Sequence, residues 1–306
     1  MSFSPIVLFT YNRLKNTQET VSCLLANREA AASDLIVYSD APKQAQAADA
    51  VRQVREYLRT VTGFRSVTLV ERTQNYGLVK NITEGVTETV NRYGRVIVLE
   101  DDHSVSPCFL QYMNEGLDRL ADREEIASIH GYMYPHRQTL PEAFLVKGAD
   151  CWGWATWKRA WDLFDSDAAR LSREIVRRGL QAEFDFGGTY PFLRMLQEQA
   201  EGKAGSWAVC WYASAFLAGK YTVYPGESLV RVNSLAEGGE HGGTARFLKK
   251  YLAPVRQQPI DWALAETDGE SLAGRQAIER FFRSLRSPLQ RVRGRMAGLF
   301  NKENCP

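Results

Sequence analysis

Three acidic residues in succession follow an apolar segment near residue 100. The segment from Arg95 to Leu99 is nearly all apolar, and Glu100, Asp101 and Asp102 come directly after it. Adjacent carboxylates repel one another, so a cation or a set of hydrogen-bond donors should compensate them. A hard divalent ion, Mn2+ or Mg2+, that joins one carboxylate to a diphosphate fits best, because both metals prefer oxygen ligands. A solvated acidic turn is the alternative.

Short apolar segments alternate with helical patterns through the first hundred residues. Helical spacing of Val79, Ile82, Val86 and Val90 illustrates the intervening helices. This alternation predicts an α/β fold, a single Rossmann-like, mostly parallel sheet flanked by helices. Ligands of such sheets bind beyond the carboxyl ends of the strands. We therefore expect chemistry in the turns that follow the four predicted strands, at residues 6–9, 35–39, 67–70 and 96–99.

Residues suited to a nucleotide lie in these turns. Arg13 follows the first strand together with Thr10, Tyr11 and Asn12, and Asp40 follows the second. Before the third helix stand Asn75, Gly77 and Lys80, where the helix N-terminus suits an anionic phosphate. Each residue has an ordinary alternative: a surface cation for Arg13, a turn former for Asp40 and Asn75, a solvated lysine for Lys80.

The acidic segment and its surroundings resemble a known enzyme family. Residues 98–112 contain an acidic triplet, a short spacer, Pro107 and an aromatic helix, and resemble the metal-binding stretch of GT-A glycosyltransferases of the N-acetylglucosaminyltransferase I type. Residues 5–13 resemble the first strand and donor-contacting arginine of that family. Residues 38–40 resemble the turn whose aspartate reads uracil, and Gly153-Trp154 followed by Trp161 resembles its glycine-tryptophan turn.

The resemblance implies a GT-A fold, a UDP-sugar donor, a manganese or magnesium ion and an inverting transfer. By position it implies that Asp102 binds the metal, that Glu100 and Asp101 face sugar and ribose, and that Arg13 and Asp40 hold the nucleotide. An inverting enzyme also needs a general base near the acceptor hydroxyl. Where the family places an aspartate beside tryptophan, this chain has Gly205-Ser206-Trp207. The candidates that remain are Asp150, ranked first, Glu201 and Asp185.

Three further residues are candidates for the site. His241 lies in a glycine-rich segment, and its imidazole would complete the metal shell; a surface histidine is the alternative. Trp152 and Trp154, beside glycine and before a helix, are expected to lie under an acceptor sugar ring. The other tryptophans are expected in the core, because the helix from Trp207 to Leu217 is apolar almost all round.

Composition limits the class of protein. Hydrophobic content of 44% with 24% charged residues is typical of a globular chain, and a net charge of +2 gives no support for nucleic-acid binding. The five cysteines show no metal-ligand spacing, so neither disulfides nor a zinc site are expected. The chain has no leader-like start and no long apolar run, so we expect it to remain in the cytoplasm.

The predicted organisation is a GT-A catalytic domain over residues 1–245 and a tail over 246–306. The domain divides into a nucleotide-sugar part, 1–107, and an acceptor part, 108–245. The tail contains seven arginines between Arg275 and Phe300, opposed by Glu279 alone, and an apolar stripe at helical spacing. Two short helices split at Pro288 are expected. They would lie on an anionic membrane at its inner face or pack on the catalytic domain.

The sequence therefore predicts a metal-dependent, inverting glycosyltransferase. It would transfer a hexosyl or N-acetylhexosaminyl group from a UDP-sugar to a glycan or lipid-linked acceptor in polysaccharide biosynthesis. The first alternative is a catalytically weak or inactive nucleotide-sugar-binding subunit of an assembly complex, which the missing aspartate favours. The second is a nucleotidyltransferase, which lacks support because no Gly-rich arginine and lysine signature stands near the first strand.

Overall fold

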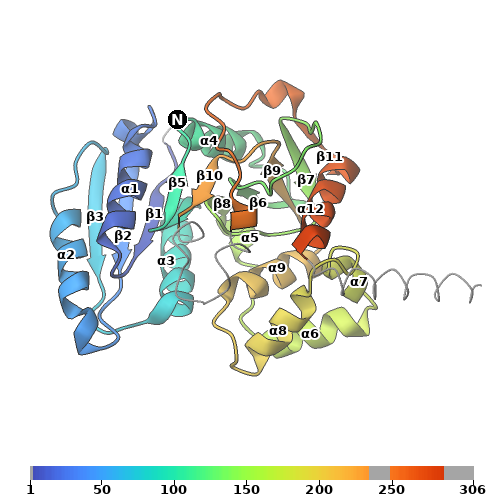
Figure 1. The fold of residues 1–306 in the computed structure, drawn as a ribbon, viewed down its shortest axis with the longest axis horizontal. Coiled ribbons are helices and arrows are strands. Elements are labelled where there is room, and N and C mark those ends of the chain that lie inside the picture. Colours follow the sequence, from blue (N-terminus) through green and yellow to red (C-terminus); the bar gives the residue numbers. More distant parts are fainter. Residues whose placement is uncertain (1–2, 234–248, 286–306) are drawn as a thin grey trace, which may run out of the picture.

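The computed structural model describes residues 3–233 and 249–285. Its centre is a nine-stranded sheet in the order β11-β7-β9-β6-β8-β4-β1-β2-β3, and a separate two-stranded sheet pairs β10 with β5 (Figure 1). The first half of the chain builds a parallel block, with β4, β1, β2 and β3 side by side and all running the same way. The predicted α/β class with a mostly parallel sheet is confirmed.

The parallel block has the strands and helices that the apolar segments predict. Its inner strands β1 and β4 are buried and mostly apolar, as expected for strands covered on both faces, while the edge strand β3 is only partly buried. Helix α3 buries the predicted stripe Ile82, Val86 and Val90. The elements are β1 (Ile6–Thr10), α1 (Leu14–Leu25), β2 (Asp34–Ser39), α2 (Ala48–Leu58), β3 (Ser66–Glu71), α3 (Gly77–Tyr93) and β4 (Arg95–Glu100), with 3-10 turns at Ala30–Ala32 and Ala45–Ala47.

The second half of the chain extends the same sheet with mixed strand directions. Strand β8 runs antiparallel between β4 and β6, and so ends the parallel block. The elements are β5 (His103–Val105), α4 (Phe109–Arg119), β6 (Ile126–His130), β7 (Ala143–Val146), β8 (Trp154–Trp157), α5 (Lys158–Trp161), α6 (Ala168–Arg177), α7 (Gln181–Phe184), α8 (Phe192–Ala200), α9 (Trp207–Leu217), β9 (Tyr221–Pro225) and β10 (Val230–Val232).

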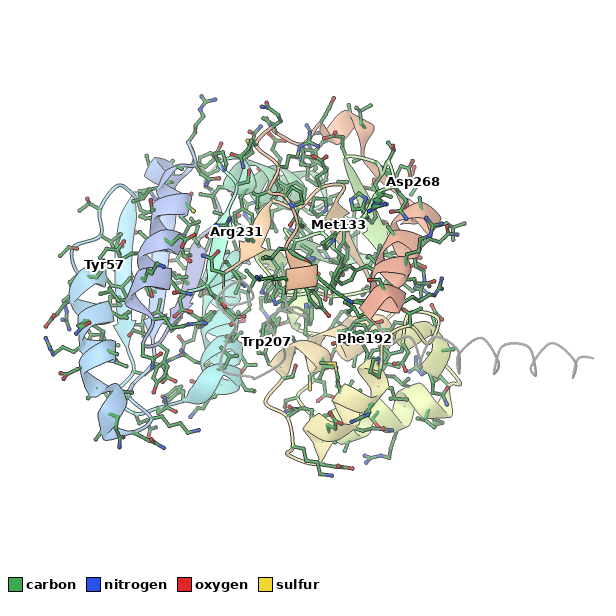
Figure 2. All side chains as sticks on the ribbon, in the orientation of Figure 1. Tyr57, Met133, Phe192, Trp207, Arg231 and Asp268 are labelled. Atoms are coloured by element: carbon green, nitrogen blue, oxygen red, sulfur yellow. The ribbon has the colours of Figure 1, made fainter. Side chains whose placement is uncertain are left out.

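Helices α6 to α9 form a group beneath the sheet, where Phe192 and Trp207 mark the starts of α8 and α9 (Figures 1 and 2). Helix α9 is buried on almost every side, as its apolar sequence predicts. Trp154 on β8 meets Trp207 and Trp211 of α9, with ring centroids 5.5 and 6.1 Å apart. Trp161 completes this cluster. The cluster joins the helical group to the sheet.

Part of the predicted tail belongs to the sheet. After the 3-10 turns Lys249–Tyr251 and Trp262–Leu264, strand β11 (Glu266–Glu270) pairs in parallel with β7, and α12 (Leu272–Leu285) packs beside it. A Cβ atom at Gly274 would clash with the Phe144 ring, so glycine allows this close packing. Of the apolar stripe, Ile278, Phe281 and Phe282 are buried in the protein.

Two arginines of α12 also pair with acids within the fold. Arg275 pairs with Glu270 and Glu279, and Arg283 pairs with Glu279. For this first predicted helix, packing on the catalytic domain is therefore what the structure shows. The second predicted helix lies outside the described residues, and membrane contact remains a prediction. Within the described ranges, no helix combines the length and apolar character needed to cross a bilayer.

Candidate active site

The acidic turn connects β4 to β5 and is held by backbone contacts on two sides. The Asp101 carbonyl accepts a hydrogen bond from Oγ1 of Thr20 on α1 at 2.9 Å. The Asp102 carbonyl accepts one from the Asn233 amide at 2.8 Å, just after β10. Asp101 and Asp102 are 2% and 7% exposed. This acidic turn is therefore a buried, fixed feature, which disfavours the solvated-turn alternative.

Arg13 is the cation that faces the acidic turn. Its Nη2 donates to Oδ1 of Asp101, and its Nη1 donates to Oδ2 of Asp102 at 3.3 Å. The carboxyl end of β1 lies beside that of β4, because these strands pair in parallel, and this places Arg13 between the two aspartates. The turns after β1 and β4, two of those expected to carry chemistry, thus lie side by side, and Arg13 contacts carboxylates of the protein directly.

Two acids of the turn have raised pKa values. Burial, followed by the charges of Asp102 and Asp101, raises the pKa of Glu100 to about 8. Burial also raises the pKa of Asp101 to about 6, against the opposing effect of Arg13. Burial is the main cause of both shifts, and the neighbouring carboxylates add to it, so a cation bound at the turn would favour the ionised forms.

The oxygen ligands of the acidic turn suit a hard divalent ion. Among the described residues, no group of three or more His, Cys, Asp or Glu side chains is arranged to hold a metal. Other ligands, such as diphosphate oxygens or water, would have to complete the shell, as is usual for Mg2+. His103 follows the acidic turn directly; burial lowers its pKa, and its Nδ1 accepts the Glu100 amide at 3.2 Å. A neutral imidazole therefore adds no positive charge here.

Asp40 joins the end of β2 to the start of α3. Its Oδ1 accepts from the amides of Ala41 and Tyr76 at 2.9 and 2.8 Å. Its Oδ2 accepts from Nδ2 of Asn75 at 3.0 Å and from the Gly77 amide at 2.9 Å. Tyr76 is the N-cap residue of α3 and makes no side-chain cap of its own, so Asp40 supplies the cap. Its carboxylate is thus occupied by the turn that carries Asn75 and Gly77.

The three candidate bases occupy very different environments. Asp150 is half-buried and accepts hydrogen bonds at Oδ2 from the hydroxyls of Tyr134, at 2.9 Å, and Tyr224, at 2.8 Å. Burial raises its pKa, while the two hydroxyls oppose the rise. Asp185 accepts the Leu193 amide at 2.8 Å and so caps α8. Glu201 is exposed and pairs with Lys203 at 2.5 Å.

Asp150 also lines a cavity of about 370 Å³. Aromatic and aliphatic side chains form most of its wall, and neither Asp185 nor Glu201 is among the lining residues. The cavity, called the aromatic pocket below, is lined by Tyr134, Gly148, Ala149, Asp150, Cys151, Trp152, Phe186, Tyr190, Phe192, Met195, Ser206, Ala208, Val209, Tyr212, Tyr224, Tyr251 and Phe282. Of the three candidate bases, Asp150 is therefore the one whose carboxylate adjoins a cavity that could hold a ligand.

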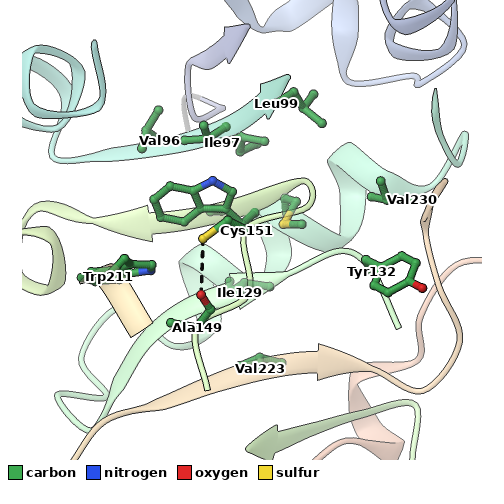
Figure 3. Packing of buried hydrophobic residues seen from close by; sticks show 14 of the residues in the cluster. Val96, Ile97, Leu99, Ile129, Tyr132, Ala149, Cys151, Trp211, Val223 and Val230 are labelled. Carbon is green, nitrogen blue, oxygen red and sulfur yellow. Dashed lines mark hydrogen bonds between the residues drawn. The ribbon is translucent and has the colours of Figure 1, made fainter. Parts of the chain in front are cut away.

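The aromatic pocket adjoins the acidic turn. Strands β4 and β8 are antiparallel with Val98 opposite Trp154, so the residues after β4 lie across from those before β8. Burial and the negative charges of Asp150 and Glu100 raise the pKa of Cys151. Its Sγ contacts the Ala149 carbonyl at 3.3 Å beneath β4 (Figure 3). The acidic turn and the pocket therefore flank Cys151.

The part of the chain that carries the acidic turn is similar to a known protein family. Residues 6–138 match the model of Glycosyl transferase family 2. The match supports a glycosyltransferase, in agreement with the GT-A fold expected above. It includes β1 to β6, with the acidic turn, Arg13 and Asp40, and it ends before Asp150. The N-acetylglucosaminyltransferase I type remains a prediction.

Comparisons over whole chains are weaker. No curated protein matches the sequence. Among solved structures, TarS of S. aureus is 15% identical with a TM-score of 0.31; the match covers 46% of this chain and 23% of that one. The mannosyltransferase PcManGT from Pyrobaculum calidifontis, solved with GDP-Man and Mn2+, is 13% identical with a TM-score of 0.38. The match covers 71% of this chain and 70% of that one. The chain therefore spans less than a quarter of TarS.

Within the family 2 region, the remaining predicted donor residues lie around the same strand ends. Thr10 is buried at the end of β1, and its Oγ1 has no partner among the described residues. The Tyr11 hydroxyl accepts the Lys43 amide at 3.0 Å, and Asn12 is half-buried beside it. Lys80 is exposed, with Nζ 4.0 Å from the Tyr76 ring centroid. Contact of these residues with a nucleotide remains a prediction.

Sequence reasoning missed Arg72, which directly follows β3. Its guanidinium lies 5.0 and 4.6 Å from the ring centroids of Tyr38 and Tyr76. Its Nη2 is buried without a hydrogen-bond partner among the described residues, although Glu84 lies 3.9 Å away. The turn after β3 was expected to carry chemistry, so a cation in that turn was the available signal. What the sequence did not show is the pair of flanking rings.

The two tryptophans predicted to bind the acceptor lie in different environments. Trp152 lines the aromatic pocket and is half-buried. Trp154 is 1% exposed and packs against Trp207, Trp161 and Trp211, which corrects its expected place under a sugar ring. Trp154 lies within β8, whose two edges pair with β4 and β6, and tryptophans of α5 and α9 cover its side chain. His241 lies outside the described residues.

Proposed function

We propose that this protein is a metal-dependent glycosyltransferase that transfers a sugar from a UDP-sugar to an acceptor hydroxyl with inversion. The transferred group is a hexosyl or N-acetylhexosaminyl group, and the acceptor is a glycan or lipid-linked sugar in polysaccharide biosynthesis. The observation that carries the proposal is the cluster of Glu100, Asp101 and Asp102 at the end of β4, with both aspartates buried around the guanidinium of Arg13, within the region that matches Glycosyl transferase family 2. A buried excess of carboxylates at a strand end suits a cation and a diphosphate.

The donor would lie across the ends of the parallel strands. Asp102 would hold the Mn2+ or Mg2+ ion, whose contribution when bound is Lewis-acid stabilisation of the departing diphosphate. Arg13 orients the two aspartates and adds positive charge on the donor side. Asp40 acts as a positioning residue, because it fixes Asn75 and the N-terminus of α3, where a phosphate is favoured.

Asp150 would act as the general base. As the acceptor oxygen attacks the anomeric carbon, its proton passes to Oδ1 of Asp150, and the bond from that carbon to the diphosphate breaks. Oδ2 is occupied by two tyrosine hydroxyls, which orient the carboxylate. The raised pKa of Asp150 brings it nearer to the working pH of a base. Release of UDP and the inverted glycoside completes the reaction.

UDP release tests the proposal. The full chain is incubated with a panel of UDP-sugars and GDP-sugars with Mn2+, with Mg2+ or with EDTA. We expect release from a UDP-sugar that requires metal and that Asp102→Asn abolishes without lowering the melting temperature. The matched control is Asp162→Asn, an exposed carboxylate paired with Lys158. Wild-type turnover by Asp102→Asn with saturating Mn2+ would contradict the metal assignment.

One observation favours a non-enzymatic alternative. Ser206 stands where the resemblance places an aspartate, and its hydroxyl accepts the Val209 amide at 3.4 Å as the N-cap of α9. A serine committed to a helix cap has no activated oxygen. A nucleotide-sugar-binding subunit would bind UDP in an Asp102-dependent manner without releasing it from any donor. The same panel, followed by calorimetry with UDP, separates the two functions.

A further inference from the structure

The aromatic pocket has a chemical character that differs from the donor side. Its described lining contains many aromatic rings and one carboxylate, Asp150, and it contains no lysine, arginine or histidine. The donor side carries Arg13, Arg72 and Lys80. A phosphate or carboxylate in the pocket would meet Asp150, and no cation stands among the described lining residues to compensate it. Arg275, 4.9 Å from the Phe186 ring centroid, is already paired with Glu270 and Glu279. The pocket therefore disfavours anionic groups, whereas the donor side suits them.

Asp150 presents one oriented acceptor to the pocket. Both tyrosine hydroxyls donate to Oδ2, from Tyr134 at 2.9 Å and Tyr224 at 2.8 Å. Oδ1 has no hydrogen-bond partner among the described residues. A carboxylate that is fixed through one oxygen offers the other at a defined position to a hydroxyl donor. The ligand must therefore supply the hydroxyl group that donates to Oδ1.

The walls define the rest of the ligand. Tyr190, Phe192 and Met195 come from the α8 side, Tyr251 from the 3-10 turn before β11, and Trp152 from the approach to β8. Flat rings and a thioether bind apolar C–H faces and offer little to a highly charged group. The cavity of about 370 Å³ is of the size that small ligands occupy. A pyranose ring has the required combination of an apolar face and hydroxyl donors.

We propose that the aromatic pocket is the acceptor subsite and that it selects an uncharged sugar ring over an acidic or phosphorylated one. One ring hydroxyl donates to Oδ1 of Asp150, while the apolar face of the ring packs on the aromatic wall. The assignment of this ligand as the acceptor rests on the proposed function. Binding of the neutral ring itself does not, because it depends only on the pocket.

Saturation-transfer NMR on the full chain, without donor, tests the binding. The probes are methyl glycosides of glucose, galactose, mannose and N-acetylglucosamine, with glucuronic acid, galacturonic acid and choline as charged comparisons. We expect at least one neutral glycoside to bind, and neither uronic acid nor choline to match it. Binding of choline alone would overturn the proposal in favour of an ammonium site. Equal binding of the acids would overturn it as well.

Two variants locate the binding. Asp150→Asn should weaken neutral-glycoside binding by about tenfold, because the tyrosines keep the amide oxygen at Oδ2 and turn its NH2 towards the pocket. Ala208→Trp should fill the pocket from α9 and remove the signal. The controls are Asp162→Asn and Ala218→Trp, both exposed, the second at the far end of α9. Circular dichroism and thermal melting confirm that each variant is folded.

The outcomes separate this inference from the proposed function. If neutral glycosides bind, Asp150→Asn weakens the signal and Ala208→Trp removes it, the subsite stands even if no UDP-sugar is turned over. If UDP release occurs but Ala208→Trp, folded, binds and glycosylates acceptors as the wild type does, the pocket is not the acceptor subsite. If no glycoside binds the wild type, with or without UDP and Mn2+ present, the inference fails.

Discussion

Nη2 of Arg13 donates a hydrogen bond to Oδ1 of Asp101, and so joins the loop after β1 to the turn after β4. Asp101 is nearly buried, whereas the Arg13 side chain keeps 42% of its surface exposed. The guanidinium therefore compensates buried charge while it remains open to a ligand. It links the stability of the acidic turn to whatever binds there.

Arg13→Gln should destabilise the protein by about 2 kcal/mol, because it leaves buried carboxylates without their cation. Mn2+ should then raise the melting temperature of the variant more than that of the wild type, because the ion replaces part of the lost charge. Thermal melting with Mn2+ and with EDTA measures both effects. Arg52→Gln, which removes an exposed arginine paired with Asp49 and Glu56, is the control. Equal effects of the two variants would contradict this role of Arg13.

The acidic turn should also make stability depend on pH. The pKa values of Glu100 and Asp101 are raised to about 8 and about 6, so the folded state holds protons that the unfolded state has released. Without metal, the free energy of unfolding should therefore fall as pH rises from about 5 to about 8. Chemical denaturation in EDTA across this range measures it.

Glu100→Gln isolates the contribution of Glu100 to that slope. Between about pH 6 and 8, the free energy of unfolding of the variant should fall less steeply with pH than that of the wild type. Each excess proton held by the folded state contributes at most about 1.4 kcal/mol per pH unit to this slope. Glu56→Gln on the exposed face of α2 serves as the comparison. An unchanged slope in Glu100→Gln would show that Glu100 ionises at an ordinary pH.

Asp40→Ala should affect both folding and donor binding. It removes the acceptor of four hydrogen bonds, three of them from backbone amides, and should cost about 3 kcal/mol of stability. Because the turn before α3 would loosen, the donor KM should rise more than kcat falls. Asp49→Ala on α2 is the control, since its carboxylate is exposed. A loss of kcat alone would argue against a positioning role at the donor.

The tyrosine partners of Asp150 should tune the pH profile of transfer. Their hydrogen bonds lower the pKa of Asp150, so Tyr134→Phe or Tyr224→Phe should raise it. The acid limb of kcat/KM, where the base loses activity by protonation, should then move to higher pH. Tyr212→Phe is the matched control, because Tyr212 lines the same pocket but donates to the Phe184 carbonyl at 2.7 Å. If the acid limb of kcat/KM moved equally in all three variants, the change would reflect a general effect on the pocket and not the hydrogen bonds to Asp150.

The features that could be predicted from the sequence arise from residues that lie close together in the chain. The strands and α3 follow from apolar runs and helical spacing, and their bounds agree closely with the prediction. The acidic triplet stands at the end of β4 because Glu100 is the last residue of an apolar strand. Parallel pairing then brings the polar turns after β1, β2 and β4 to one edge, and this is a general property of such sheets.

Tertiary structure decided which of these residues have partners, because those partners are distant in sequence. Asp40 meets Gly77, Arg13 meets Asp101, and Asp150 meets Tyr224, and no local pattern encodes such pairs. Trp152 and Trp154 are two residues apart, yet one lines a cavity and the other lies in the core. Trp154 lies within β8, between β4 and β6, and its side chain packs on α9, whereas Trp152 precedes the strand and its side chain reaches the pocket.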